Sequence, residues 1–115
     1  MAQANLIIIR IRTEETERFE QMFRDEEVPI WRDLHEKSGL RHATLTKIAF
    51  GTDADAAAAA GYREYGIYAE FESMAGHSAH DDDQRFNAFL KEARKLQPKG
   101  PSVWGGNTVA TLSDE

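Results

Sequence analysis

Three of the four histidines in the 115-residue sequence are candidates for binding a metal ion or for acting as a general base. His77 and His80 are three residues apart, so in a helix they share one face, and the carboxylates of residues 81–83 follow directly. Imidazole and carboxylate groups together form metal sites. The alternative is an ordinary helix start at which the aspartates act as caps. We favour this alternative, because two histidines without a placed third ligand are common, and we predict no metal and no cofactor.

A histidine also serves as a general base, since its pKa lies near neutral pH. His42, close to Thr44, and His77 are the two candidates for that catalytic role. For His42, an ordinary strand position with a neighbouring partner is the simpler explanation. His35 stands near the end of the first predicted helix, where a positive charge suits the helix dipole, and we expect it at the surface.

Four aromatic side chains are candidates for lining a pocket that holds a flat organic ligand: Trp31, Tyr65, Tyr68 and Trp104. Packing in a core or at a dimer interface is the simpler explanation for most of them. Trp31 differs from the rest because it follows Pro29, where a helix is distorted and can border a cavity. The predicted ligand pocket consists of Trp31, His42, Tyr65 and His77.

The composition argues against several classes of protein. Without cysteine the chain has no disulfides, thiolate nucleophiles or cysteine-bound metals. Fourteen basic and twenty acidic residues give a net charge of -6, and we therefore predict no nucleic-acid binding. No run of about 18 apolar residues occurs, which predicts no membrane contact. The start lacks the positive segment of a signal peptide, so we expect a cytoplasmic protein.

Six main elements are expected to position these side chains. Alternating apolar residues predict strands at residues 6–12, 40–50, 63–71 and 103–112. A first helix, capped by Thr13, is expected to kink near residues 27–28 because Pro29 removes a hydrogen bond, and to stop at residues 38–39.

The segment after the second strand and the second helical region are less regular. Residues 51–61 contain five alanines in a row, too few to sustain a helix alone, and are expected to form a mobile hairpin connection. Ser73 is expected to cap a short helix. Residues 81–84 resemble a capping box, with Asp81 as the cap, and the amphipathic pattern after them predicts a second long helix.

The order strand-helix-strand-strand-helix-strand predicts an α+β, ferredoxin-like single domain over residues 1–115, with both helices on one face of a four-stranded antiparallel sheet. The other face is also half apolar, because Leu6 and Ile8 alternate with Arg10 there. Tyr68 and a cross-strand pair of Arg10 with Glu70 are expected on the same face. A monomer rarely exposes such an apolar patch to solvent, so we predict a homodimer that pairs through its sheets.

The order of elements resembles the dimeric α/β-barrel superfamily, and it does so over nearly the whole chain. Two runs place the likeness nearest to the NIPSNAP-like and antibiotic-biosynthesis-monooxygenase-like branches: Tyr68-Ala69-Glu70-Phe71-Glu72-Ser73-Met74 and Asp83-Gln84-Arg85-Phe86-Asn87-Ala88-Phe89. The resemblance implies a barrel of paired sheets and often a pocket between helices and sheet. It implies no single activity, because the superfamily includes oxygenases, cyclases, haem-degrading enzymes and isomerases.

Two departures limit what the resemblance implies. Phe86 stands near the place where the stress-responsive and cyclase branch has its histidine. Ile67 and Tyr68 stand where the haem-degrading branch has a tryptophan, which disfavours haem, although His77 could take the place of that branch's histidine. We predict a homodimer of unassigned activity that binds a small apolar or aromatic ligand between helices and sheet. The alternative is a cofactor-independent monooxygenase or cyclase-type enzyme acting on an aromatic, polyketide-like molecule, with His42 or His77 as the base.

Overall fold

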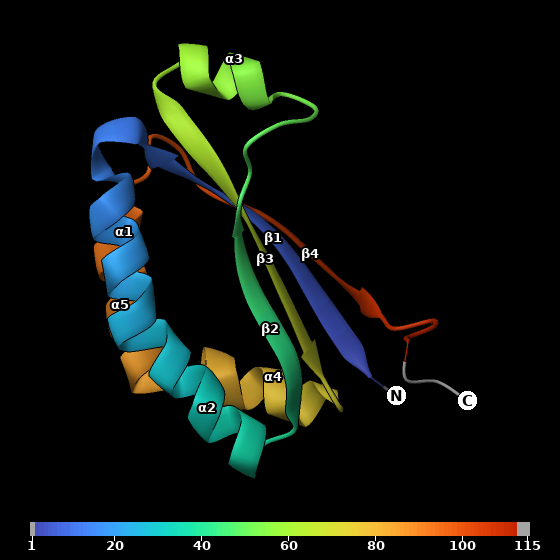
Figure 1. Cartoon of the computed structure of the whole chain (residues 1–115). Helices are drawn as coiled ribbons and strands as arrows, with labels where there is room; N and C mark the ends of the chain where they lie inside the picture. The colour runs from blue at the N-terminus through green and yellow to red at the C-terminus, as the bar shows by residue number, and fades with distance from the viewer. Residues whose placement is uncertain (1, 113–115) are drawn as a thin grey trace.

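A computed structural model describes residues 2–112 and contains a four-stranded antiparallel sheet with its long helices on one face (Figure 1). The strands lie in the order β2-β3-β1-β4. Their bounds are Gln3–Arg12 for β1, Leu40–Lys47 for β2, Tyr62–Phe71 for β3 and Ser102–Asn107 for β4. This arrangement is the split βαβ fold, and it confirms the predicted ferredoxin-like class.

The first helical region joins β1 to β2 and changes its winding along its length. It consists of the 3₁₀ turn η1 (Thr13–Glu15), α1 (Thr16–Met22), the π-helical turn η2 (Phe23–Glu27) and α2 (Val28–Lys37). The remaining helices are α3 (Ala54–Ala59), α4 (Met74–Asp81) and α5 (Gln84–Arg94). None of the helices within residues 2–112 has the length and hydrophobicity that a membrane crossing requires.

The π-helical turn coincides with the kink that Pro29 predicts. Proline has no N–H to donate, so the regular helical hydrogen bonding is interrupted one turn before it. The helix widens over Phe23–Glu27 and becomes regular again at Val28. Phe23 and Glu27, the first and last residues of the turn, are both buried. Such π turns are rare and frequently lie at functional sites.

The core lies between the sheet and the helices in two adjoining clusters. The first contains Ile9, Ile11, Phe19, Phe23, Tyr65, Phe89, Ala93 and Leu96, and the second Ile30, Leu34, Leu40, Ala69 and Phe71. Trp31 and Phe86 pack against both clusters. Burying one large apolar side chain contributes roughly 1.5–3 kcal/mol, so these residues fix the position of the helices on the sheet.

The expected hairpin connection over residues 51–61 is wrong in part, because its alanines form the helix α3. Six residues do not sustain a helix alone, and packing against the rest of the protein must stabilise it. The side chain of Ala57 provides such a contact, since it is buried. α3 lies at the end of the sheet that is remote from both termini, where it joins β2 to β3 (Figure 1).

The predicted pairing of Arg10 with Glu70 is wrong because of the strand register. β1 and β3 pair so that Arg10 lies opposite Glu64, and Ala4 lies opposite Glu70. The Arg10 Nε lies 3.2 Å from Glu64 Oε2. Glu70 instead accepts hydrogen bonds from the hydroxyls of Tyr68 and Thr108.

The capping prediction at Asp81 is also wrong, since Asp83 caps α5. Its Oδ1 accepts a hydrogen bond of 2.8 Å from the backbone N–H of Arg85. Hydrogen bonds from the Arg85 guanidinium and backbone lower the pKa of Asp83 to about 2. Two strands are shorter than predicted, because β2 ends at Lys47 and β4 ends at Asn107.

Candidate ligand-binding site

A cavity of about 380 Å³ lies between the first helical region and β2. Its apolar walls are Phe23, Val28, Trp31, Ala43 and Leu45. Phe23 and Trp31 meet edge to face, with ring centroids 5.1 Å apart, so each ring fixes the other. Small-molecule sites have volumes of roughly 300–1,000 Å³ and mostly apolar linings. The cavity therefore suits a small, flat organic molecule.

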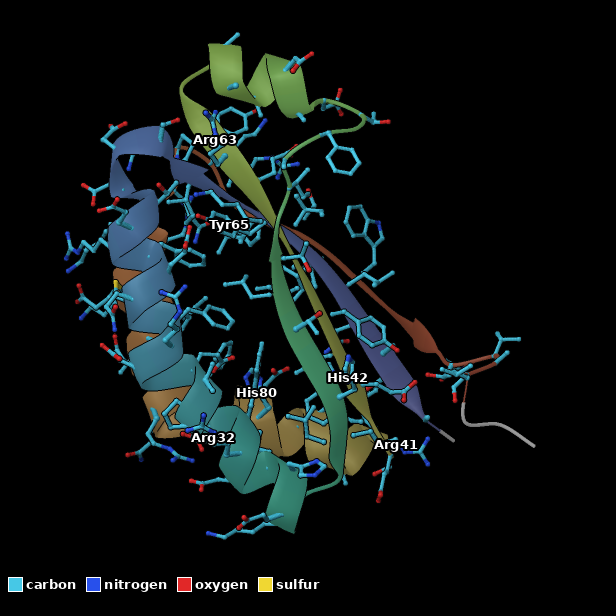
Figure 2. The ribbon with its side chains drawn as sticks, in the orientation of Figure 1. Arg32, Arg41, His42, Arg63, Tyr65 and His80 are labelled. Carbon is cyan, nitrogen blue, oxygen red and sulfur yellow. The ribbon has the colours of Figure 1, made fainter. Side chains whose placement is uncertain are left out.

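One end of the cavity is polar and centres on the carboxylate of Glu20. The Tyr65 hydroxyl donates a hydrogen bond of 2.6 Å to Glu20 Oε2, and Lys47 Nζ lies 3.1 Å from the same oxygen. Arg24 Nη2 lies 3.8 Å from Oε1. Figure 2 shows Tyr65 on β3, facing the first helical region from which Glu20 comes.

The electrostatics of this cluster fix its protonation at neutral pH. The hydrogen bond from Tyr65, followed by the hydrogen bond and charge of Lys47, holds the pKa of Glu20 below its ordinary value of 4.5. Burial and the hydrogen bond to Glu20 raise the pKa of Tyr65 above its ordinary value of 10.0. Glu20 is therefore an ionised, weak base and Tyr65 a neutral phenol. The cluster can orient a ligand, but it is poorly suited to removing a proton from one.

A second hollow, of about 370 Å³, continues along the edge of β2 and shares Val28, Trp31 and Ala43 with the cavity. Arg32, His35 and Glu36 line it from α2, and Leu40, Arg41 and His42 line it from β2. Figure 2 shows Arg32 on the helix and Arg41 and His42 on the strand. Trp31 therefore stands where the two hollows meet.

The structure brings together two of the four residues predicted to form a ligand pocket. Trp31 and Tyr65 line the same cavity. His42 is exposed at the rim of the second hollow, and its ring lies 6.0 Å from that of Tyr68 on the uncovered face of the sheet. His77 lies elsewhere, stacked on Phe71 with ring centroids 5.6 Å apart and its Nδ1 3.0 Å from Gln3 Oε1. Neither candidate base therefore lines the cavity that contains Trp31 and Tyr65.

The two histidines considered as metal ligands belong to a chain of hydrogen bonds. His80 Nε2 lies 2.9 Å from Glu27 Oε2, and His80 Nδ1 lies 3.2 Å from Asp81 Oδ1. His77 Nε2 lies 3.0 Å from the other oxygen of Asp81. Within residues 2–112, no group of three or more such side chains is placed to hold a metal ion. Both ring nitrogens of His80 face carboxylate oxygens, an arrangement that favours the doubly protonated ring.

Glu27 is the buried end of this chain, with only 4% of its surface exposed. Its Oε1 has no hydrogen-bond partner among residues 2–112. Burial raises the pKa of Glu27 above its ordinary 4.5, although the hydrogen bond from His80 opposes this effect. For His80, burial lowers the pKa, but the hydrogen bond and charge of Glu27 outweigh burial and raise it above 6.5. Glu27 and His80 thus form a buried pair behind the cavity.

The polar end of the cavity was not among the residues predicted from the sequence. Lys47 follows Leu45 by two residues, so strand alternation would have placed its side chain on the helix-facing side. Glu20 precedes Phe23 by three residues, a spacing that places both on one helix face. No comparable sequence pattern identifies Glu27, because the residues around it in the sequence do not predict that a glutamate is buried.

Comparisons with known proteins find similar solved structures, and the similarity is one of fold. No protein-family model and no curated protein sequence matches the chain. Rv0793 from Mycobacterium tuberculosis matches with a TM-score of 0.75 and 12% identity, over 98% of this chain and 100% of that one. A variant of SnoaB, a cofactor-independent oxygenase from Streptomyces nogalater, matches with a TM-score of 0.67 and 14% identity, over 98% of both chains.

A third match is a dimeric ferredoxin-like protein from an uncultured marine organism, with a TM-score of 0.73 and 15% identity, over 99% of this chain and 93% of that one. At such low identity these likenesses establish the fold alone. They confirm at that level the resemblance found in the sequence. The chain has the ferredoxin-like fold of the antibiotic-biosynthesis-monooxygenase-like and dimeric ferredoxin-like proteins.

Proposed function

We propose that this protein binds a small, flat aromatic molecule in the cavity between the first helical region and β2. The observation that carries the proposal is the pair of rings, Phe23 and Trp31, that meet edge to face in the apolar wall of a cavity of about 380 Å³. Phe23 is buried and holds Trp31 in place, and a flat aromatic molecule can stack on the partly exposed indole of Trp31. The polar groups at one end would fix its orientation.

The cofactor-independent oxygenase activity of the SnoaB variant belongs to that protein, and binding is the function that this chain's own residues favour. A reaction that begins with removal of a proton from the substrate needs a base within hydrogen-bond reach of the ligand. Among the described residues that line the cavity there is no histidine, and the pKa of Glu20 is lowered first by its hydrogen bond from Tyr65.

Filling the cavity should weaken binding of the proposed ligand. Replacing Ala43 by leucine adds a branched side chain to the wall, and we expect it to weaken binding of 2-naphthamide, a neutral flat probe, by about tenfold or more. Isothermal titration calorimetry measures the affinity. Ala88→Leu is the matched control, because Ala88 is exposed on α5 and does not line the cavity. Equal affinities of the two variants would refute the proposed site.

We also propose that two chains pair through the face of the sheet that the helices leave uncovered. A hollow of about 420 Å³ lies on that face, lined by Leu6, Ile8, Ile48, Tyr68 and Trp104 around Gly66. Leu6 is 53% exposed and Trp104 is 56% exposed. Contiguous apolar surface of this kind is typical of an interface, and a two-fold axis lets one patch cover its copy. The likeness to a dimeric ferredoxin-like protein supports the pairing.

A charge on this face should separate the chains. We expect the wild-type protein to sediment with the mass of two chains at micromolar concentration, and Trp104→Glu with the mass of one, because pairing would bury an unpaired carboxylate. Val103→Glu is the matched control. Val103 is 62% exposed on the same strand, and its side chain lies on the opposite face because strand residues alternate. A wild-type protein of single-chain mass would contradict the pairing.

A further inference from the structure

We propose that the ligand is an aromatic acid whose single negative charge lies against Lys47 and Arg24 at the polar end of the cavity. This inference rests on the proposed binding function and adds the chemical class of the ligand. It requires three features of the site: an excess of positive charge, hydrogen-bond donors that are not already used, and an apolar wall for the rest of the molecule.

The charge of the site is opposite to that of the whole chain. The chain has 14 basic and 20 acidic residues. The cavity and the second hollow are lined by four basic side chains, Arg24, Arg32, Arg41 and Lys47, and by two acidic ones, Glu20 and Glu36. Cationic groups around a hollow with low-dielectric walls focus their field into it and attract anions.

The donors at the polar end exceed its acceptors. Glu20 neutralises one of two neighbouring cations and leaves one positive charge in excess. Lys47 Nζ carries three N–H groups, and only one of them is needed for the contact of 3.1 Å with Glu20 Oε2. Arg24 Nη2, at 3.8 Å from Oε1, lies beyond hydrogen-bond range of Glu20. A second carboxylate would therefore find charged donors here, and such hydrogen bonds are the strong ones.

The same balance distinguishes an acid from other ligands. A cationic ligand would face the excess positive charge of Lys47 and Arg24. A phosphate carries up to about two negative charges at neutral pH, whereas Glu20 leaves only one positive charge uncompensated. The remaining wall, made by Phe23, Val28 and Trp31, is apolar. One carboxylate on a flat ring satisfies both parts of the site.

The test compares two probes of nearly equal shape, 2-naphthoate and its neutral counterpart 2-naphthamide, by isothermal titration calorimetry. We expect the wild-type protein to bind the acid about tenfold more tightly than the amide, which corresponds to about 1.4 kcal/mol. Lys47→Gln should reduce the ratio of the two affinities towards one. The ratio in the wild-type protein should also fall as salt is added, because salt screens exposed charges.

Lys91→Gln is the control for the loss of one positive charge. Lys91 is exposed on α5 and does not line the cavity, so this variant should keep the wild-type ratio. Equal affinity of the wild-type protein for acid and amide would overturn the inference and leave the proposed binding function intact, as would an unchanged ratio in Lys47→Gln. If neither probe binds, the proposed function fails and the inference fails with it.

Discussion

Replacing His80 by alanine is expected to lower the free energy of unfolding by roughly 3–5 kcal/mol, the usual effect of breaking a buried ion pair from one side. His80 Nε2 lies 2.9 Å from Glu27 Oε2, and Glu27 is 4% exposed. Without the imidazole, this carboxylate loses both its charged partner and the hydrogen bond to His80. The loss is large for a domain whose total stability is about 5–15 kcal/mol. Urea denaturation followed by circular dichroism measures it.

Two further variants separate the buried charge from simple loss of packing. His80 also packs on Phe86, with ring centroids 4.1 Å apart, so some destabilisation comes from the ring itself. Adding Glu27→Gln to His80→Ala removes the charge, and we expect this double variant to be more stable than His80→Ala alone. His42→Ala removes an exposed histidine and should change stability by about 0.5 kcal/mol or less. A double variant less stable than His80→Ala would exclude the buried charge as the cause.

The Glu27–His80 pair makes the stability of the folded protein depend on pH. The pKa values of Glu27 and His80 are both raised in the folded protein. Burial raises the pKa of Glu27. Burial lowers the pKa of His80, but the hydrogen bond and charge of Glu27 raise it by more. The native state therefore binds more protons than the unfolded state. Its stability must fall as the pH rises from the ordinary value of 4.5 for Glu27 to beyond the ordinary 6.5 for His80.

Neighbouring charges reinforce this direction. Asp81 raises the pKa of His80 through its hydrogen bond and charge, and the charge of Asp83 raises that of Glu27. The lowered pKa values of Asp83 and Glu20 act below pH 4.5, outside the window. Unfolding curves at about pH 5 and about pH 8 should show the wild-type protein losing stability, whereas the double variant without both groups should lose less. Equal pH slopes would contradict this account.

Replacing Gly76 by alanine is the second change for which we expect a large effect. A Cβ at this position would lie 2.2 Å from the carbonyl oxygen of Ser38 and 3.2 Å from the ring of Phe71. The first neighbour is backbone and cannot rotate away, so α4 would have to move off the end of α2. Overpacking of this kind costs about 1–3 kcal/mol or more, although alanine is intrinsically better than glycine in a helix by about 1 kcal/mol.

The measurement decides whether overpacking or helix propensity dominates the change in stability of Gly76→Ala. Thermal or urea unfolding of Gly76→Ala should show lower stability than the wild-type protein. Gly100→Ala is the matched control, because a Cβ there comes no closer than 3.9 Å to a neighbouring atom, Arg94 Nη2, and the residue lies outside the strands. An unchanged or raised stability of Gly76→Ala would mean that helix propensity prevails and that α4 does not require close contact with Ser38.

The sequence predicted the fold well because its main signals are local. Alternating apolar residues located all four strands, and Pro29 located the distortion of the first helical region. The errors concern interactions across the fold. The register that pairs Arg10 with Glu64 depends on how two strands meet, and the helix α3 depends on the burial of Ala57.

The site divides in the same way. Trp31 and Tyr65 were predicted as pocket residues and both line the cavity. The Glu27–His80 pair joins residues 53 positions apart, and only the packing of α4 against α2, α5 and β3 brings them together. Single-sequence patterns carry no information on such a contact, and for the same reason they suggested His77 as a pocket residue.

The sheet places the protein's two indole fluorophores on opposite sides of one layer, since Trp31 lines the cavity and Trp104 lines the hollow on the far face. Each would respond to a different one of the two proposed events, ligand binding in the cavity for Trp31 and pairing with a second subunit for Trp104. Emission from variants that retain one indole can therefore report these events separately, without an added dye. The intrinsic fluorescence of the protein thus offers two separate signals, one for each face of the sheet.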